Sequence, residues 1–371
     1  MQDTQGLYPL KFAPILKERL WGGHRLHSLL GKKNLSEHIG ESWELSGVTG
    51  DISVVENGFL KGNDLQELTE VYMGDLVGDR VYERFGVEFP VLIKFIDAQD
   101  DLSIQVHPDD ELAAKRHNAY GKTEMWYVLE AEADSRLIVG FNRAMNRDAY
   151  LQAVEDKKLP EILNVEKVEK GDVFFIPAGR VHAICKDIIV AEIQQTSDIT
   201  YRIYDWDRVD ANGKPREMHT DLATDAIDFS TQADYKTRYL KKPQGSVDIV
   251  KCPYFTTRLT SLHHPLNVDY HDIDSFVIYI CTSGSCRINY GGGELPIGKG
   301  ETVLLPAVLK NVQLIPEKSA ELLEVFIDGQ NSIQQEPFDY TKWQEDLFED
   351  MSIEEISRKA ANYRTHGKLI Q

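Results

Sequence analysis

The stretch GDVFFIPAGRVHAI, residues 171–184, has a second version later in the chain, GETVLLPAVLKNVQL at residues 300–314. Each version begins with Gly, continues through five mostly apolar residues and reaches Pro-Ala. A short apolar run between Gly and Pro predicts a buried strand bounded by turns. The first version goes on to Gly179 and His182, and the second lacks both. The two versions therefore share a strand and a turn but differ in their polar residues.

A similar strand precedes each version of this stretch. TEMWYVLEAE lies at residues 123–132 and SFVIYICTSG at residues 275–284, so that Glu124 matches Phe276 or Val277. Two unrelated hairpins with common turn residues would explain one such match. Two matching strand pairs in the same order favour a duplicated β-module.

The second copy replaces the polar residues of the first. Val308 stands where Gly179 would be, and Asn311 where His182 would be. We therefore expect one domain over residues 1–245 that keeps the polar residues and a degenerate, structural copy over residues 246–330. Residues 331–371 form a tail of different composition, with a short helix expected after the capping box of Ser352 and Glu355.

The rest of the pattern is also mainly β. Short strands separated by Gly and Pro are predicted within residues 88–195, and the absence of a strand–helix alternation argues against a doubly wound parallel sheet. Helical inserts are predicted at residues 109–118 and 147–163, and a longer helix at 63–86, begun by a capping box. Residues 51–55 alternate like a strand, and 208–245 read as a polar linker with a packing strand.

Composition excludes several kinds of partner. The net charge of −19 and the pI near 5.0 argue against nucleic acid and anionic membranes. No apolar run is long enough to span a bilayer, and the start of the chain does not resemble a secretory signal. The four cysteines form no CxxC pair and are expected to be reduced, so the protein is predicted to be cytoplasmic.

Four polar residues of the first copy have the types that bind a metal ion. Gln105 and His107 are two apart and project from one face of a strand, Glu124 opens the next strand of the repeat, and His182 follows the Pro-Ala-Gly turn. Two imidazoles and a carboxylate are typical of catalytic Zn²⁺ or Fe²⁺ with open coordination positions. A lone His after a turn is usually an ordinary polar residue, but this set is missing as a whole from the second copy.

The chain resembles known proteins at these residues. Gly171-x5-Pro177-x-Gly179-x2-His182 is similar to the second cupin motif. Gln105-x-His107 with Glu124 resembles the first motif, except that Gln replaces its first His, an insert precedes Glu124, and Ala131 stands at its Gly. Longer strings between residues 10 and 330 resemble type I mannose-6-phosphate isomerases of the short bacterial branch: LWGG (20–23), GESWELS (40–46), FPVLIKFIDA (89–98), LSIQVHPDD (102–110), GKTEMWYVL (121–129), PAGRVHAI (177–184) and AEIQQTSDITYRIYDW (191–206).

This resemblance implies a fold and a reaction. The fold would be mainly β, with two cupin-type jelly-roll barrels, helical inserts in the first and a short helical tail. The reaction would interconvert mannose 6-phosphate and fructose 6-phosphate by proton transfer between C1 and C2 through an enediolate. One Zn²⁺ per chain would be bound by Gln105, His107, Glu124 and His182. Arg202 would be catalytic, and Lys122 would belong to the substrate site.

A sugar phosphate on so acidic a chain needs a local basic pocket. Lys94 interrupts the apolar run VLIKFI, which predicts a buried lysine paired with an acid, Glu192 being the first choice. The residues expected to bind substrate are Ser103, Lys94, Lys122 and Asp198. The general base is left open between Glu192, Asp198 and Lys122, of which Glu192 is placed with Arg202 and Lys122 in the catalytic set.

Two other functions use the same metal ligands. A non-haem iron cupin dioxygenase would have this set of His and carboxylate residues, and a non-catalytic cupin could bind sugar. A dioxygenase usually has an apolar pocket and gives no reason for a cluster of basic residues. The cluster of Lys94, Lys122 and Arg202 on the metal-binding copy therefore favours the isomerase.

Overall fold

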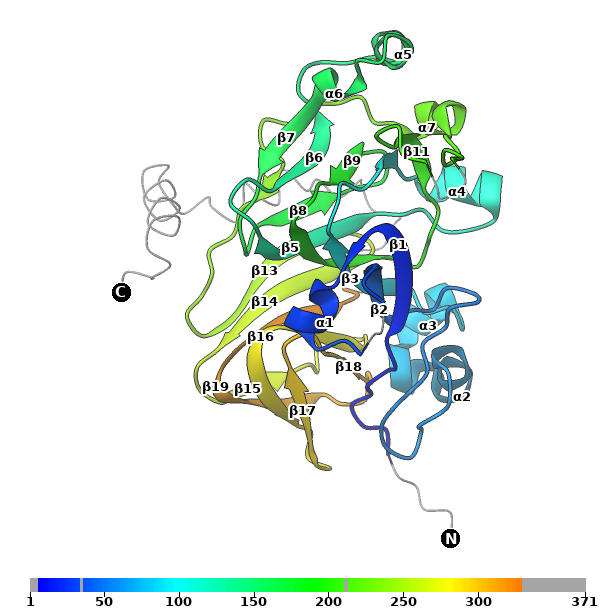
Figure 1. Ribbon diagram of the computed structural model, residues 1–371. Helices are drawn as coiled ribbons and strands as arrows, with labels where there is room; N and C mark the ends of the chain where they lie inside the picture. Colours follow the sequence, from blue (N-terminus) through cyan, green and yellow to red (C-terminus); the bar gives the residue numbers. More distant parts are fainter. Residues whose placement is uncertain (1–5, 34–35, 210–212, 329–371) are drawn as a thin grey trace.

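The strands of the protein form three antiparallel sheets in two stacked jelly-roll-like units (Figure 1). The computed structural model describes residues 6–33, 36–209 and 213–328. The predicted fold class is confirmed, although the sheets remain open rather than closing into barrels. The helical tail predicted at residues 331–371 lies outside the described residues. No helix in the described ranges is long and apolar enough to cross a membrane.

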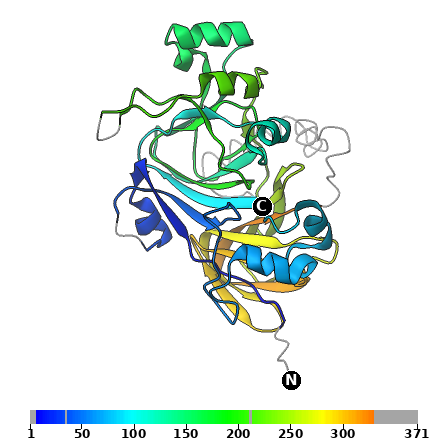
Figure 2. The ribbon, with the colours of Figure 1, turned by 90° about the vertical axis from the view of Figure 1, so that its right-hand side faces the viewer.

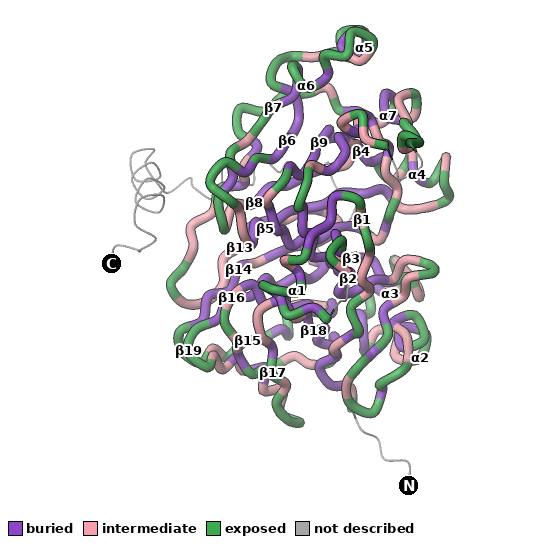
Figure 3. Tube along the Cα trace, in the orientation of Figure 1, coloured by how far each residue is buried: buried purple, intermediate pink, exposed green. Residues whose placement is uncertain are grey.

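The first unit consists of a seven-stranded and a five-stranded sheet that face each other. The larger sheet has the order β1 (Ile15–Gly23), β2 (Ile39–Leu45), β3 (Val91–Ala98), β10 (Ile188–Gln195), β5 (Glu124–Ala131), β8 (Val173–Ile176) and β12 (Lys236–Thr237). The smaller sheet has the order β11 (Tyr201–Tyr204), β4 (Ile104–Val106), β9 (His182–Ile184), β6 (Arg136–Phe141) and β7 (Leu163–Lys167). β3, β10 and β5 are buried along most of their length because both faces of the sheet are covered (Figure 3).

The second unit lies below the first in both views of the ribbon (Figures 1 and 2). Its strands are β13 (Gly245–Lys251), β14 (Thr256–Leu262), β19 (Asn311–Phe326), β16 (Val277–Asn289) and β17 (Glu294–Gly298), with β15 (Leu266–Asp269) paired to β19 and β18 (Thr302–Leu305) paired to β16. β19 lies between β14 and β16 as β10 lies between β3 and β5. The sheet order therefore repeats, as the duplicated sequence predicts.

Seven helices lie outside the sheets in the described ranges: α1 (Arg25–Leu30), α2 (Leu65–Val77), α3 (Asp79–Phe85), α4 (Asp110–His117), α5 (Arg147–Glu155), α6 (Leu159–Ile162) and α7 (Thr220–Ala226). The predicted capping box begins α2, since Asp64 Oδ1 accepts from the Glu67 amide at 2.8 Å. The helix predicted at 63–86 is two helices, because Gly78 between them has φ 96° and lies against the Asp274 carbonyl. The insert at 147–163 is likewise two helices.

One short segment differs from the sequence prediction. Residues 51–55 do not form a strand; Val54 and Val55 make only isolated bridges, to Asp64 and Phe12 respectively. The strands of this region are β1 and β2, whose pairing is irregular at Glu18. The strand predicted at 51–55 is wrong, because this segment makes only isolated bridges and does not pair along a sheet.

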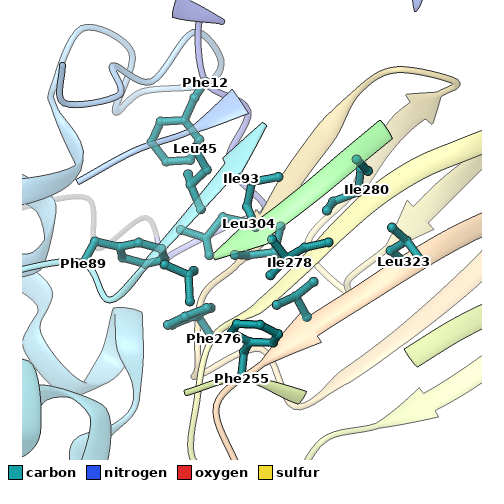
Figure 4. Close-up of a cluster of buried hydrophobic side chains, with 14 of the residues drawn as sticks. Phe12, Leu45, Phe89, Ile93, Phe255, Phe276, Ile278, Ile280, Leu304 and Leu323 are labelled. Carbon is teal, nitrogen blue, oxygen red and sulfur yellow. The ribbon is translucent and has the colours of Figure 1, made fainter. Parts of the chain in front are cut away.

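One hydrophobic core joins the two units (Figure 4). Phe12, Leu45 and Ile93 of the first unit belong to the same buried cluster as Ile278 and Leu323 of the second. The rings of Phe89 and Phe276 lie 4.6 Å apart between centroids. Backbone hydrogen bonds between Leu10 and Leu304, at 2.8 and 2.9 Å, join the same two regions. The second unit therefore supports the sheet that carries the candidate site.

Replacing Asn311 by alanine is expected to leave turnover nearly unchanged. Asn311 is exposed at the start of β19, and the corresponding position of the first copy is His182. Surface substitutions of this kind usually change stability by about 0.5 kcal/mol or less. Steady-state kinetics and thermal unfolding test this, and a large loss of turnover in a folded variant would show that the second unit contributes directly to the site.

Candidate active site

Three buried side chains from three strand ends converge in the first unit. His107 follows β4, Glu124 is the first residue of β5, and His182 is the first residue of β9. His107 Nε2 lies 3.4 Å from Glu124 Oε2, and His182 Nε2 lies 3.2 Å from Glu124 Oε1. Within the described part of the chain, this is the one group of three His, Cys, Asp or Glu side chains arranged to hold a metal ion.

Both imidazoles present a lone pair to this point. His107 Nδ1 lies 2.8 Å from the Ile199 carbonyl, and His182 Nδ1 lies 2.8 Å from the Arg180 carbonyl. A carbonyl only accepts, so each Nδ1 is the donor and each Nε2 is unprotonated. Burial lowers the pKa of both rings, that of His107 to about 3, so both are neutral at pH 7. This is the form and orientation in which histidine binds a metal ion.

The carboxylate of Glu124 completes the fit. Burial opposes its charge, but Lys122, His182 and His107 together outweigh this and hold the pKa of Glu124 well below its usual range. Neither carboxylate oxygen accepts a well-directed hydrogen bond from the described residues, although Lys122 Nζ lies 2.9 Å from Oε2. A buried carboxylate without a hydrogen-bond donor, between two imidazole lone pairs, fits a divalent cation.

Gln105 and Lys122 separate this triad from a cavity of about 460 Å³. The side-chain amide of Gln105 lies 3.2 Å from His182 Nε2, so its oxygen can reach the same point when the amide is turned. Lys122 Nζ lies 3.1 Å from His107 Nε2. Burial opposes its charge, but Glu124 and Glu192 outweigh this and raise the pKa of Lys122. It therefore lacks the lowered pKa expected of a general base at neutral pH.

The cavity brings the other predicted residues together. Its wall includes Lys94, Ser103, Gln105, Lys122, Glu192, Asp198 and Arg202. Asp198 and Thr200 precede β11 instead of belonging to it, yet they line the cavity with Arg202 as an alternating segment would. The predicted set is thus one spatial cluster, next to the candidate metal ligands.

Comparison with known proteins agrees with this geometry. The model of the catalytic domain of phosphomannose isomerase type I matches residues 10–133, and that of the mannose-6-phosphate isomerase cupin domain matches residues 246–327. The chain is 36% identical over 312 residues to mannose-6-phosphate isomerase ManA of Bacillus subtilis, covering 82% of this chain and 95% of that protein. The chain belongs to the type I phosphomannose isomerase family.

Further members and solved structures share the same fold. A mannose-6-phosphate isomerase of Streptococcus mutans is 33% identical, with 82% of this chain and 94% of that protein covered. The crystal structure of mannose 6-phosphate isomerase from Bacillus subtilis superposes with a TM-score of 0.77 at 31% identity, over 86% of this chain and 99% of that one. A putative mannosephosphate isomerase from Archaeoglobus fulgidus, at 20% identity and a TM-score of 0.69, shares the fold over 86% of this chain and 97% of that one.

The buried lysine of this isomerase fold is paired as predicted. Lys94 Nζ lies 3.3 Å from Glu192 Oε1, and Trp126 Nε1 donates to Glu192 Oε2 at 2.8 Å. Burial, together with the charge of Glu124, raises the pKa of Glu192. Glu192 on β10 thus lies opposite a cation on β3 and an aromatic residue on β5. The second unit has the same arrangement, because Glu324 on β19 lies opposite Arg258 on β14 and Tyr279 on β16.

Replacing Lys94 by Met is expected to lower the free energy of unfolding by about 3–5 kcal/mol, because Glu192 is left buried without its cation. The double variant Lys94→Met/Glu192→Gln removes both charges and should recover most of that loss. Denaturant unfolding of the two variants gives the comparison. Equal stability of the single and double variants would mean that the two charges are not coupled.

Sequence reasoning missed three charged residues of the cavity wall, Arg19, Glu41 and Arg216. Arg19 donates to Glu41 from Nε at 3.1 Å and from Nη2 at 3.0 Å, across the β1–β2 pair. Arg216 lies in the stretch 208–245, which the sequence predicts to be a polar linker but which carries helix α7 and part of the cavity wall. Arg19 lies just before the string LWGG and Glu41 lies within GESWELS, so the resemblance could have indicated both. No local pattern indicates Arg216.

Proposed function

We propose that this protein interconverts mannose 6-phosphate and fructose 6-phosphate, with one Zn²⁺ per chain held by Gln105, His107, Glu124 and His182. The observation that carries the proposal is a buried His–Glu–His set, with both imidazoles neutral, beside a cavity whose wall is rich in cations. When bound, zinc would supply an electrophile that stabilises negative charge on the sugar oxygens. Family membership supports the sugar phosphate as substrate and favours the isomerase over a dioxygenase or a sugar-binding protein.

We assign different roles to the other residues of the cavity wall. Glu192 is assigned to proton transfer between C1 and C2, since its raised pKa brings a carboxylate nearer to the range that suits a base at neutral pH. Lys122, charged and next to Glu124, can stabilise the enediolate together with Arg202. Ser103, Lys94, Lys122 and Asp198 are proposed to contact the substrate from the cavity wall.

The same proposal covers the organisation of the chain. Residues 1–245 would form the catalytic domain, 246–330 the structural copy and 331–371 a separate tail. All four cysteines are free and buried, and burial raises their pKa to about 12, so they are protonated at neutral pH. Such thiols agree with a reducing, cytoplasmic location.

A coupled assay for fructose 6-phosphate formed from mannose 6-phosphate tests this function. We expect turnover by the zinc-loaded protein and about one zinc per chain by elemental analysis. The Asn311→Ala variant serves as a matched control, because it changes the repeat position of His182 outside the site. A zinc-loaded, folded protein without turnover would refute the proposal.

A further inference from the structure

The cations of the cavity wall differ in how they are neutralised. Five line the wall, and three of them have a carboxylate of their own: Lys94 with Glu192 at 3.3 Å, Lys122 with Glu124 at 2.9 Å, and Arg19 with Glu41 at 3.0 Å. Arg202 and Arg216 remain. These two arginines are therefore the wall cations that pair with no carboxylate of the wall among the described residues.

Arg202 has no acidic partner among the described residues. Its Nη1 donates to the Glu217 carbonyl at 2.9 Å, and its Nε is buried without a hydrogen bond. Burial and the charge of Arg216 lower the pKa of Arg202, against the opposing charges of Asp205 and Glu217. A buried donor without an acceptor is costly unless a ligand satisfies it.

Arg216 shares one buried carboxylate with a second arginine. Its Nε donates to Asp205 Oδ2 at 2.6 Å and its Nη2 to Asp205 Oδ1, while Arg208 Nη2 donates to Asp205 Oδ1 at 2.6 Å. Nη1 of Arg216 makes no hydrogen bond to the described part of the chain. Asp205 thus fixes the orientation of Arg216, while Arg208 also lies 3.7 Å from Asp100 through its Nη1.

The backbone holds the two arginines beside the candidate metal site. The His219 amide donates to the Arg202 carbonyl at 2.8 Å, and the Arg202 amide donates to His219 Nδ1 at 3.0 Å. The segment that carries Arg216 therefore lies along β11. Within the pair of β11 and β4, Arg202 is directly opposite Gln105. The arginines and the proposed metal ligand thus share one cavity wall.

We propose that Arg216 binds the phosphate dianion of the substrate, and that Asp205 is a positioning residue for Arg216. Arg202, opposite Gln105 on the neighbouring strand, contacts both the phosphate and the sugar oxygens next to it. The planar guanidinium can donate two parallel hydrogen bonds to phosphate oxygens, which suits the free donors of both residues. The lysines of the wall lie against Glu192 and Glu124, close to the candidate metal ligands, and are left for the sugar end. This inference rests on the proposed function, because it takes a sugar phosphate as the ligand of the cavity.

The test compares Arg216→Gln with a matched control, Arg208→Gln. Both variants remove one of the two arginines on Asp205, but Arg208 does not line the cavity. Calorimetry on the zinc-loaded proteins measures binding of mannose 6-phosphate, inorganic phosphate and mannose. We expect Arg216→Gln to weaken both phosphate ligands by about 10- to 100-fold, the usual effect of losing a charge-assisted contact, and to leave mannose unchanged. Arg208→Gln should change none of the three by more than a small factor.

Two results would overturn the inference. One is equal weakening of mannose and of mannose 6-phosphate by Arg216→Gln. The other is an equal loss of phosphate affinity in Arg208→Gln. That result would assign the loss to the disturbed contacts of Asp205 instead of to a phosphate contact of Arg216. Circular dichroism and thermal unfolding exclude misfolding, and Arg216→Lys, which keeps the charge without the fork, should recover only part of the affinity. Phosphate binding is measured apart from turnover, so an inactive wild-type protein would refute the isomerase proposal separately.

Discussion

His182→Ala is expected to abolish both zinc binding and turnover. The ring is fully buried, its Nδ1 is held by the Arg180 carbonyl, and its Nε2 has Glu124 as its near neighbour. Alanine removes one ligand from a small set, and even the loss of a supporting hydrogen bond behind a ligand costs about 10–100-fold in metal affinity. We therefore expect a loss of more than about 100-fold in affinity. His107→Ala should behave in the same way.

Equilibrium dialysis with zinc and steady-state kinetics measure the two effects side by side. Asn311→Ala is the matched control, since it alters the equivalent turn of the second copy. A chelator should remove activity from the wild-type protein, and added Zn²⁺ should restore it. Two ions per chain, or full turnover in protein free of metal, would be incompatible with the proposed site.

Arg202→Ala is expected to keep the fold and the bound zinc but to lose at least about 100-fold in kcat/KM. Its guanidinium lines the cavity, has no acidic partner among the described residues, and lies opposite Gln105 on the neighbouring strand. It is therefore free to bind the anionic substrate and to offset charge that develops in the transition state. A contact that acts mainly in the transition state contributes more than an ordinary hydrogen bond.

The conservative variant makes this prediction specific. Arg202→Lys retains a positive charge but not the planar fork, so only partial recovery of kcat/KM is expected. Circular dichroism and zinc content confirm that both variants are intact. Near wild-type kinetics for Arg202→Ala would leave Arg202 as an ordinary cavity-wall residue without a catalytic role.

Local patterns predicted the strands that are bounded by strong turn signals. The short strands predicted within residues 88–195 are present as β3 to β10, and the candidate metal ligands followed from comparing the repeat with its altered copy. The single helix expected at 63–86 was wrong because the backbone leaves helical geometry at Met73 and again at Gly78, where Asp274, distant in sequence, packs closely. No local pattern contains that contact.

The cavity wall was predictable where its residues belong to strands or lie within a few residues of one. Lys94 was conspicuous because it interrupts an apolar run, and its pairing with Glu192 follows from the register of β3 and β10. Arg216 lies in an irregular segment, and hydrogen bonds to β11 and the Asp205 carboxylate determine its position. Such long-range contacts leave no periodicity in the sequence.

The core shared by the two units has a consequence for how variation affects this enzyme in a cell. Phe276 and Ile278 pack with Phe89 and Ile93, so truncating Phe276 to alanine would destabilise the catalytic sheet by about 3–5 kcal/mol through a cavity far from the metal ligands. Losses of this size reduce the amount of folded protein that survives quality control, while each surviving molecule works at its normal rate. Natural selection can therefore act on the second half of the chain through abundance and lifetime.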